Sequence, residues 1–176
     1  MQLFEGFVCL INGEGDRMLK NQDIIIIKEA LTQNYTMFYR IAYSYVHNEE
    51  DAQDIVQESA YKAIYHAKKL KKAEFVKTWI CRIVINESIS FLRRQKREQV
   101  SLIAEQIASN SEQTDMTDLR KALEQLKPEE RTIIILRYFE EMKLEEIAAV
   151  CKESVSTVKS RLYRTLKKLR LDLEQI

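Results

Sequence analysis

The sequence LEEIAAVCKESVSTVKSRLYRTLKKLR, residues Leu144–Arg170, decides the fold class of this protein. Leu144–Val150 predicts a short helix, and Ser154–Arg170 predicts a second helix after a tight turn. Apolar residues recur in the second helix at spacings of four, four and three, which places them on one face that can pack against a neighbouring helix. They are Val158, Leu162, Leu166 and Leu169. The pattern predicts a helix-turn-helix.

The opposite face of this second helix is suited to binding an anion. Ser154–Arg170 contains six basic residues and no acidic one, and the hydroxyl residues Ser156, Thr157 and Ser160 gather at its amino end. Hydroxyl groups and an unpaired helix N-terminus suit phosphate oxygens and base edges, while Lys and Arg supply sequence-independent attraction. A solvated charged face is the simpler alternative, but the paired helices favour a DNA-reading helix.

Composition favours an all-α fold. With three Gly and one Pro in 176 residues, there is little material for the turns of a β-sheet. Cys9, Cys81 and Cys151 are widely spaced, and His47 and His66 lack ligand-spaced companions, so we predict neither a metal nor another cofactor. The thiols fit a reducing cytoplasm, and no apolar run is long enough to insert into a membrane.

Changes in composition along the chain predict two small helical domains. We expect an N-terminal extension over residues 1–22, a first helical domain over 23–97, a flexible polar linker over 98–117 and a second helical domain over 118–176. Glu14-Gly15-Asp16 can be encoded by a purine-rich ribosome-binding sequence, so we hypothesise that translation starts naturally at Met18.

In the first domain, helical periods are expected over Asp23–Val46, with a break near residues 32–36, over Asp51–Ala67 and over Phe75–Lys96. Arg82, Asn86 and Ser90 are spaced by four and therefore share one face of the last helix. Basic, amide and aromatic side chains on one helix suit unpaired nucleic acid. Phe75, Trp79, Ile83, Ile85, Ile89 and Leu92 are expected to supply its core contacts. In the second domain, the helical stretch Glu129–Phe139 is expected to carry Ile133, Ile134, Leu136 and Tyr138 into a core.

Four stretches in this order resemble the extracytoplasmic-function (ECF) sigma factors, compact sigma-70-family subunits of bacterial RNA polymerase. Asp51–Ile64 is similar to conserved region 2.2, Phe75–Arg97 to regions 2.3 and 2.4, Leu123–Ala148 to the first part of region 4, and Val155–Arg170 to its DNA-reading helix. The resemblance implies a sigma region 2 domain and a helix-turn-helix sigma region 4 domain. It also implies a non-enzymatic initiation factor that directs core polymerase to promoters, without a small-molecule substrate.

The resemblance assigns roles to individual residues. The core polymerase-binding positions, which in the family contact the β′ clamp, are Asp54, Gln57 and Glu58. The positions that face the minus-10 element are Arg82, Asn86 and Ser90. The positions that enter the major groove at the minus-35 element are Ser156, Thr157, Lys159, Ser160, Arg161 and Arg164. Lys68–Glu74 matches the loop that holds a flipped base. The β flap and an anti-sigma factor are further partners implied by the family.

The turn of the helix-turn-helix departs from the family pattern. Lys152 stands where the family usually has Gly, and Glu153 stands where it usually has an apolar residue. A left-handed backbone at Lys152 would cost about 1 kcal/mol relative to Gly.

Two other functions remain open from the residues. A conventional dimeric helix-turn-helix regulator would bind an operator without polymerase, but it leaves Asp51–Arg97 unexplained. A helical nuclease could use Asp51, Asp54 and Glu58, yet no second ligand cluster or nucleophile-base pair accompanies these carboxylates.

Overall fold

The computed structural model describes residues 22–105, 121–123 and 125–174, and the elements in this part of the chain are helices without a β-strand. The predicted all-α fold is therefore confirmed. The chain divides into two compact units, Met1–Phe91 and Leu92–Ile176. The predicted extension, the Met18 start, Cys9 and linker residues 106–117 lie outside the described residues.

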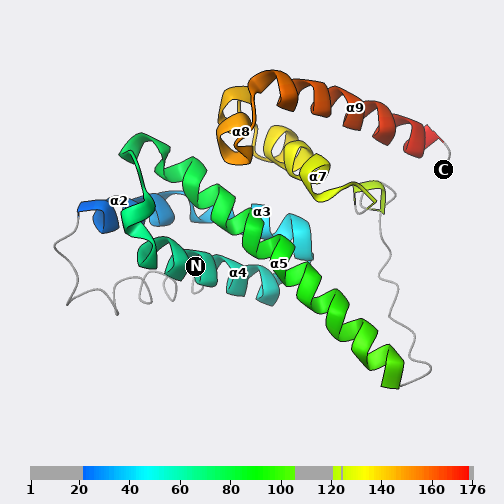
Figure 1. The fold of residues 1–176 in the computed structure, drawn as a ribbon, viewed down its shortest axis with the longest axis horizontal. Helices are drawn as coiled ribbons and strands as arrows, with labels where there is room; N and C mark the ends of the chain where they lie inside the picture. Colours follow the sequence, from blue (N-terminus) through cyan, green and yellow to red (C-terminus); the bar gives the residue numbers. More distant parts are fainter. Residues whose placement is uncertain (1–21, 106–120, 124, 175–176) are drawn as a thin grey trace. The chain divides into compact units, whose positions relative to one another are not determined.

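The first unit is built from α2 (Gln22–Gln33), α3 (Tyr35–Val46), α4 (Glu49–Tyr65) and the start of α5 (Val76–Glu105), as Figure 1 shows. Two single-turn 3-10 helices, η1 (Ala67–Lys69) and η2 (Ala73–Phe75), connect α4 to α5. The predicted break between the first two helices is confirmed near Asn34. Helix α3 packs along α4, and the largest fully buried side chains of this unit are Ile27, Leu31, Phe38, Ile41, Val56, Ile80 and Val84.

Helix α4 begins at Glu49, earlier than the predicted Asp51, because Asn48 caps it. The Asn48 Oδ1 atom accepts a hydrogen bond from the Asp51 backbone N–H at 3.0 Å. An Asn cap satisfies one of the amide groups left unpaired at a helix start, and the acidic first turn complements the helix dipole. This local chemistry fixes where the predicted polymerase-binding helix starts.

The buried face of α5 agrees only in part with the predicted one. Ile85 is buried as predicted, Trp79, Ile83, Ile89 and Leu92 are half-buried, and Phe75 is 46% exposed. Ile80, Cys81, Val84 and Ser88, which were not predicted to be buried, are buried. Apolar residues occupy so many positions around this helix that the 3.6-residue period does not select one face. Only packing against the other helices of the unit decides which residues are buried.

Helix α5 continues to Glu105, so residues 98–105 of the predicted linker are helical. No Gly or Pro interrupts the stretch between Val76 and Glu105, and polar residues such as Gln, Glu and Lys are good helix formers. Polar composition predicted a linker over these residues, but the same composition is also compatible with a helix.

The second unit contains α7 (Pro128–Ile134), the π-helical turn η3 (Ile135–Phe139), α8 (Leu144–Cys151) and α9 (Val155–Glu174). Residues 121–123 are also helical. The Glu146 carboxylate caps the N-terminus of α8 by accepting a hydrogen bond from the Lys143 backbone N–H at 2.8 Å. The core of this unit contains Ile133, Ile135, Leu136, Ile147, Val158 and Leu162.

Two predictions for this unit have different outcomes. The apolar face of α9 is confirmed, since Val158, Leu162 and Leu169 are buried and Leu166 is half-buried. The prediction that Tyr138 enters the core is wrong, because this side chain is 54% exposed. The π-helical turn after Ile134 breaks the α-helical period on which that prediction depends.

Candidate nucleic-acid interface and polymerase-binding face

Hydroxyl groups organise the start of α9. Ser154 Oγ accepts a hydrogen bond from the Thr157 backbone N–H at 3.1 Å, and it lies 2.8 Å from both Ser156 Oγ and Thr157 Oγ1. Ser154 is therefore the N-cap, a role that the sequence signals by placing a Ser directly before the helical period. The capped end presents several hydroxyl groups to solvent.

The predicted minus-35 residues share this end of α9, although their burial differs. Exposed members of the set are Ser156, Thr157, Lys159, Ser160 and Arg164. Arg161 is half-buried, and its Nη1 atom lies 2.8 Å from Glu153 Oε1 in an ion pair. Tyr163 is 61% exposed on the same helix and was not among the predicted DNA-binding residues.

The turn between α8 and α9 has the left-handed backbone considered from the sequence. Lys152 has φ 57° and ψ 40°, and its backbone N–H donates to the Ala148 carbonyl. The Glu153 backbone N–H donates to the same carbonyl at 3.0 Å. These bonds satisfy an otherwise unpaired carbonyl at the end of α8. The turn therefore has the left-handed backbone conformation that Gly usually adopts, although Lys152 occupies this position.

Cys151 lies beside this turn. Burial, and secondarily the Glu153 carboxylate, raises the pKa of the Cys151 thiol to about 11, although Arg161 acts in the opposite direction. Since a thiolate is the reactive form of cysteine, this raised pKa disfavours reaction of the Cys151 thiol near neutral pH.

Helix α5 carries the predicted minus-10 residues on its exposed side. Asn86 and Ser90 are exposed and Arg82 is half-buried. The connector before α5 contains four exposed lysines, Lys68, Lys69, Lys71 and Lys72, while Leu70 between them is buried. The Lys72 ammonium lies 5.8 Å from the centre of the exposed Phe75 ring. Basic and aromatic groups thus lie together where the sequence predicted contact with unpaired DNA.

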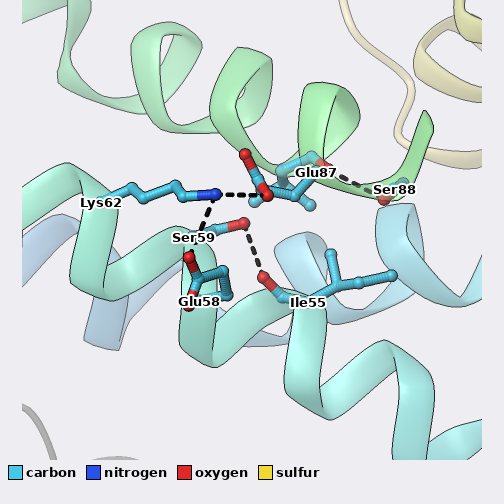
Figure 2. A network of polar contacts seen from close by, with 7 residues as sticks. Ile55, Glu58, Ser59, Lys62, Glu87 and Ser88 are labelled. Atoms are coloured by element: carbon cyan, nitrogen blue, oxygen red, sulfur yellow. Dashed lines mark hydrogen bonds and ion pairs between the residues drawn. The ribbon is translucent and has the colours of Figure 1, made fainter. Parts of the chain in front are cut away.

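The predicted polymerase-binding residues Asp54, Gln57 and Glu58 are all exposed on α4. One turn beyond Glu58, Lys62 Nζ lies 3.0 Å from Glu58 Oε1 and 2.6 Å from Glu87 Oε2 on α5 (Figure 2). Desolvation lowers the pKa of Lys62, but the hydrogen bonds to Glu87 and Glu58 outweigh it and leave that pKa above its usual value. Lys62 therefore connects the predicted polymerase-binding helix to the predicted minus-10 helix.

Two rows of stacked tyrosines on the first unit, of which Tyr43, Tyr61 and Tyr65 are exposed, were not anticipated as a set. Tyr35, Tyr39 and Tyr43 stack in succession along α3 with centroid separations of 6.3 and 6.0 Å, and Tyr61 stacks on Tyr65 along α4 at 6.1 Å. The i, i+4 spacing in the sequence signals both rows. Tyr61 and Tyr65 continue the exposed side of α4 that begins with Asp54 and Glu58.

Over the described part of the chain, no group of His, Cys, Asp and Glu residues could hold a metal ion. The same residues include no helix that is long and apolar enough to cross a membrane.

Comparisons with known proteins assign the two halves of the chain to one family. Residues 30–98 match the family model "Sigma-70 region 2", and residues 116–169 match "Sigma-70, region 4". RNA polymerase sigma factor SigV of Bacillus subtilis is 42% identical over 151 residues, which cover 84% of this chain and 91% of that protein. The ECF RNA polymerase sigma factor SigW of the same organism is 26% identical over 78% of this chain and 83% of its own length.

A solved structure shows the same relationship. The sigma factor RpoE of Bartonella quintana, solved in complex with the anti-sigma factor NepR, has a TM-score of 0.64 and 28% identity, covering 84% of this chain and 96% of that one. Both family models agree with the predicted order of a region 2 domain followed by a region 4 domain. The chain therefore belongs to the ECF group of the sigma-70 family of RNA polymerase sigma factors.

Proposed function

We propose that this sigma factor binds core RNA polymerase in the cytoplasm and directs it to promoters by reading the minus-35 element with α9 and the minus-10 element with α5. The observation that carries the proposal is the start of α9, where a capped, hydroxyl-rich helix end adjoins exposed cations. Such an end fits the major groove, where hydroxyl groups reach base edges and cations contact phosphates.

For the minus-35 element, the exposed residues Ser156, Thr157, Lys159, Ser160 and Arg164 are proposed to face the DNA. Side chains near the N-terminus of a recognition helix contact base edges in helix-turn-helix proteins. The buried Val158 and Leu162 hold the helix against its own unit and leave this side available. Arg161 is half-buried and paired with Glu153, unlike the exposed members of this set.

For the minus-10 element, Arg82, Asn86 and Ser90 are proposed to contact an unpaired strand, with the lysine-rich connector holding an unstacked base. Unstacking a base costs a few kcal/mol, which contacts with the extruded base offset. The exposed amide of Asn86 offers both donor and acceptor groups for a base edge. Strand capture of this kind would stabilise opened DNA without any bond chemistry by this chain.

The polymerase side of the proposal rests on α4. Asp54, Gln57 and Glu58 are exposed and are proposed to bind the β′ clamp, while the second unit is proposed to meet the β flap. An anti-sigma factor is a further proposed partner, because the related RpoE was solved with one. The domain limits 23–97 and 118–176, and a tether between them, complete the proposed organisation.

Run-off transcription with purified core polymerase tests the proposal. Promoters would first be found by mapping transcription start sites after overexpression of the chain. We expect specific transcripts only when core polymerase and this chain are both present. Tight operator binding by the chain alone, without new transcripts, would instead favour the dimeric helix-turn-helix regulator.

A further inference from the structure

The ion pair between Glu153 and Arg161 joins the turn of the helix-turn-helix to the face of the DNA-reading helix. Glu153 lies in the turn before α9, and Arg161 lies two helical turns into α9. Their side chains are only 26% and 22% exposed, and the Nη1–Oε1 distance is 2.8 Å. This pair is considerably more buried than the Lys72–Glu74 pair, whose side chains are 67% and 62% exposed.

The second carboxylate oxygen of Glu153 makes the pair unusually dependent on Arg161. Glu153 Oε2 is buried and accepts no hydrogen bond from the residues that the structure describes. A partly buried carboxylate is stabilised by a compensating partner, and removal of one member of such a pair leaves the other uncompensated. The Arg161 guanidinium therefore provides the positive charge that balances the Glu153 carboxylate.

The position of Glu153 also matters for the electrostatics of the interface. It is the acidic residue directly before a helix segment that carries six basic residues and no acidic one from Ser154 to Arg170. An unpaired carboxylate there would repel the phosphates that this helix is proposed to approach. Pairing with Arg161 neutralises it, and at the same time removes one positive charge from the attraction between α9 and DNA.

We propose that Glu153 and Arg161 are positioning residues, which fix α9 relative to its turn while withholding the Arg161 charge from the DNA phosphates. This inference rests on the proposed minus-35 function and changes the role of one residue within it. Arg161 acts through Glu153 and the turn, whereas Lys159 and Arg164 are exposed and remain DNA contacts.

Salt dependence distinguishes a positioning residue from a phosphate contact. The logarithm of affinity falls with the logarithm of salt concentration by about 0.9 per phosphate contact. We expect R164A to weaken promoter binding by polymerase carrying this chain and to reduce the salt slope by about one. R161A should weaken binding by roughly tenfold, in the range of couplings between contacting residues, with an unchanged slope.

The measurement is a titration of duplex promoter DNA with reconstituted polymerase at several KCl concentrations, using a promoter identified by start-site mapping. R161M, which retains much of the side-chain length without the charge, is included in case R161A loosens the second unit. Hydrogen exchange of α8 and α9 amides checks that each variant is folded. A slope reduced by about one in R161A or R161M would overturn the inference, because Arg161 would then contact phosphate.

Glu153 provides an opposite test. Because we infer that Glu153 holds the Arg161 charge away from the phosphates, E153Q should release that charge, and we expect the salt slope to become steeper by about one. The double variant E153R/R161E should recover most of the affinity lost in R161E. An unchanged slope with E153Q, or no recovery in the double variant, would contradict the inference.

These outcomes are separate from failure of the proposed function. If wild-type chain and core polymerase do not bind or transcribe promoters selectively, the sigma-factor function itself fails. If they do, and only the predictions for Arg161 and Glu153 fail, the interface stands and the positioning role is wrong.

Discussion

At the scale of single residues, exposure separates groups available to DNA from groups that hold the fold. Asn86 and Ser88 are close in the sequence of α5, yet Asn86 is exposed, whereas Ser88 is fully buried and donates to the Val84 carbonyl at 2.8 Å. A hydroxyl that bonds back to its own helix is not available to a ligand. The polar residues of a helix therefore cannot be assigned to binding by composition alone.

We predict that Asn86→Ala slows promoter opening while leaving initial binding to the duplex nearly unchanged. The side chain is exposed, so its removal should not destabilise the unit, and loss of a base-edge hydrogen bond of about 1 kcal/mol corresponds to a roughly fivefold effect. Permanganate footprinting of unpaired thymines measures opening. Arg164→Ala is the matched control, expected to weaken upstream binding instead. A reversed pattern would show that the two units have been given the wrong DNA elements.

A second prediction concerns Cys151. Because its pKa is raised to about 11, the folded protein should resist alkylation at Cys151 near pH 8 and react fully only after unfolding. In the unfolded chain the thiol has its usual pKa of 9.0 and therefore loses its proton at a lower pH than in the folded protein. The contribution of Cys151 to the free energy of unfolding should therefore fall as pH rises from about 9 to about 11. Peptide mapping after brief iodoacetamide treatment measures the reaction. Rapid modification of folded protein at pH 8 would contradict the assigned burial and charge environment.

At the scale of elements, caps and turns determine where the interface helices start and how they are oriented. Ser154 caps α9 and Asn48 caps α4, so the first residues of both helices are fixed by local hydrogen bonds. The left-handed Lys152 sets the turn between α8 and α9. These features are local in sequence, and they govern where the proposed DNA-reading face begins.

Lys152→Gly should stabilise this turn. A left-handed backbone is strained for a residue with a Cβ, and Gly relieves that strain, although Gly also increases the freedom of the unfolded chain. The net gain should be at most about 1 kcal/mol. Slower hydrogen exchange of α8 and α9 amides in the full chain would report it. Lys152→Ala is the control, because it removes the charge but keeps the Cβ; equal gains in both variants would show that backbone strain is not the cause.

The contact between α4 and α5 through Lys62 gives another prediction. In a double-mutant cycle, Lys62→Ala and Glu87→Ala should show a coupling of about 0.5 kcal/mol, since the ammonium is partly exposed to solvent. Because the pKa of Lys62 is raised in the folded protein, the stabilisation by this ion pair is fully present below pH 10.5, the usual pKa of a lysine, and is lost as the pH rises above that value. Urea unfolding followed by Trp79 fluorescence measures the cycle. The more exposed Lys72–Glu74 pair serves as the control and should show little coupling.

At the scale of the whole molecule, the proposed function requires two units that each contribute part of a promoter interface. Each unit has its own helical core, and the family models match region 2 in one part of the chain and region 4 in the other. Two modest DNA interfaces on one chain gain affinity when a third partner holds them at the correct separation. In the proposed function, core polymerase is that partner.

The isolated chain should therefore bind promoter duplex weakly, and polymerase should enhance promoter selectivity by about a hundredfold or more. Fluorescence anisotropy with labelled promoter and scrambled DNA, with and without core polymerase, measures this difference. Asp54→Lys together with Glu58→Lys should remove the enhancement by disrupting polymerase binding. If the isolated wild-type chain already binds as selectively as the complex, the proposed division of labour is incorrect.

The sequence by itself determined the all-α fold, the helix-turn-helix, the break between α2 and α3, and the family. These follow from local period, scarce Gly and Pro, and motif order, which do not depend on distant contacts. The tertiary structure decided the buried face of α5, the exposure of Tyr138, and the pairing of Arg161 with Glu153. Apolar residues surround α5, a π-helical turn interrupts the period before Tyr138, and the spacing of Arg161 from Glu153 does not reveal how the turn folds back. Packing and turn geometry select among alternatives that the local pattern leaves equally favourable.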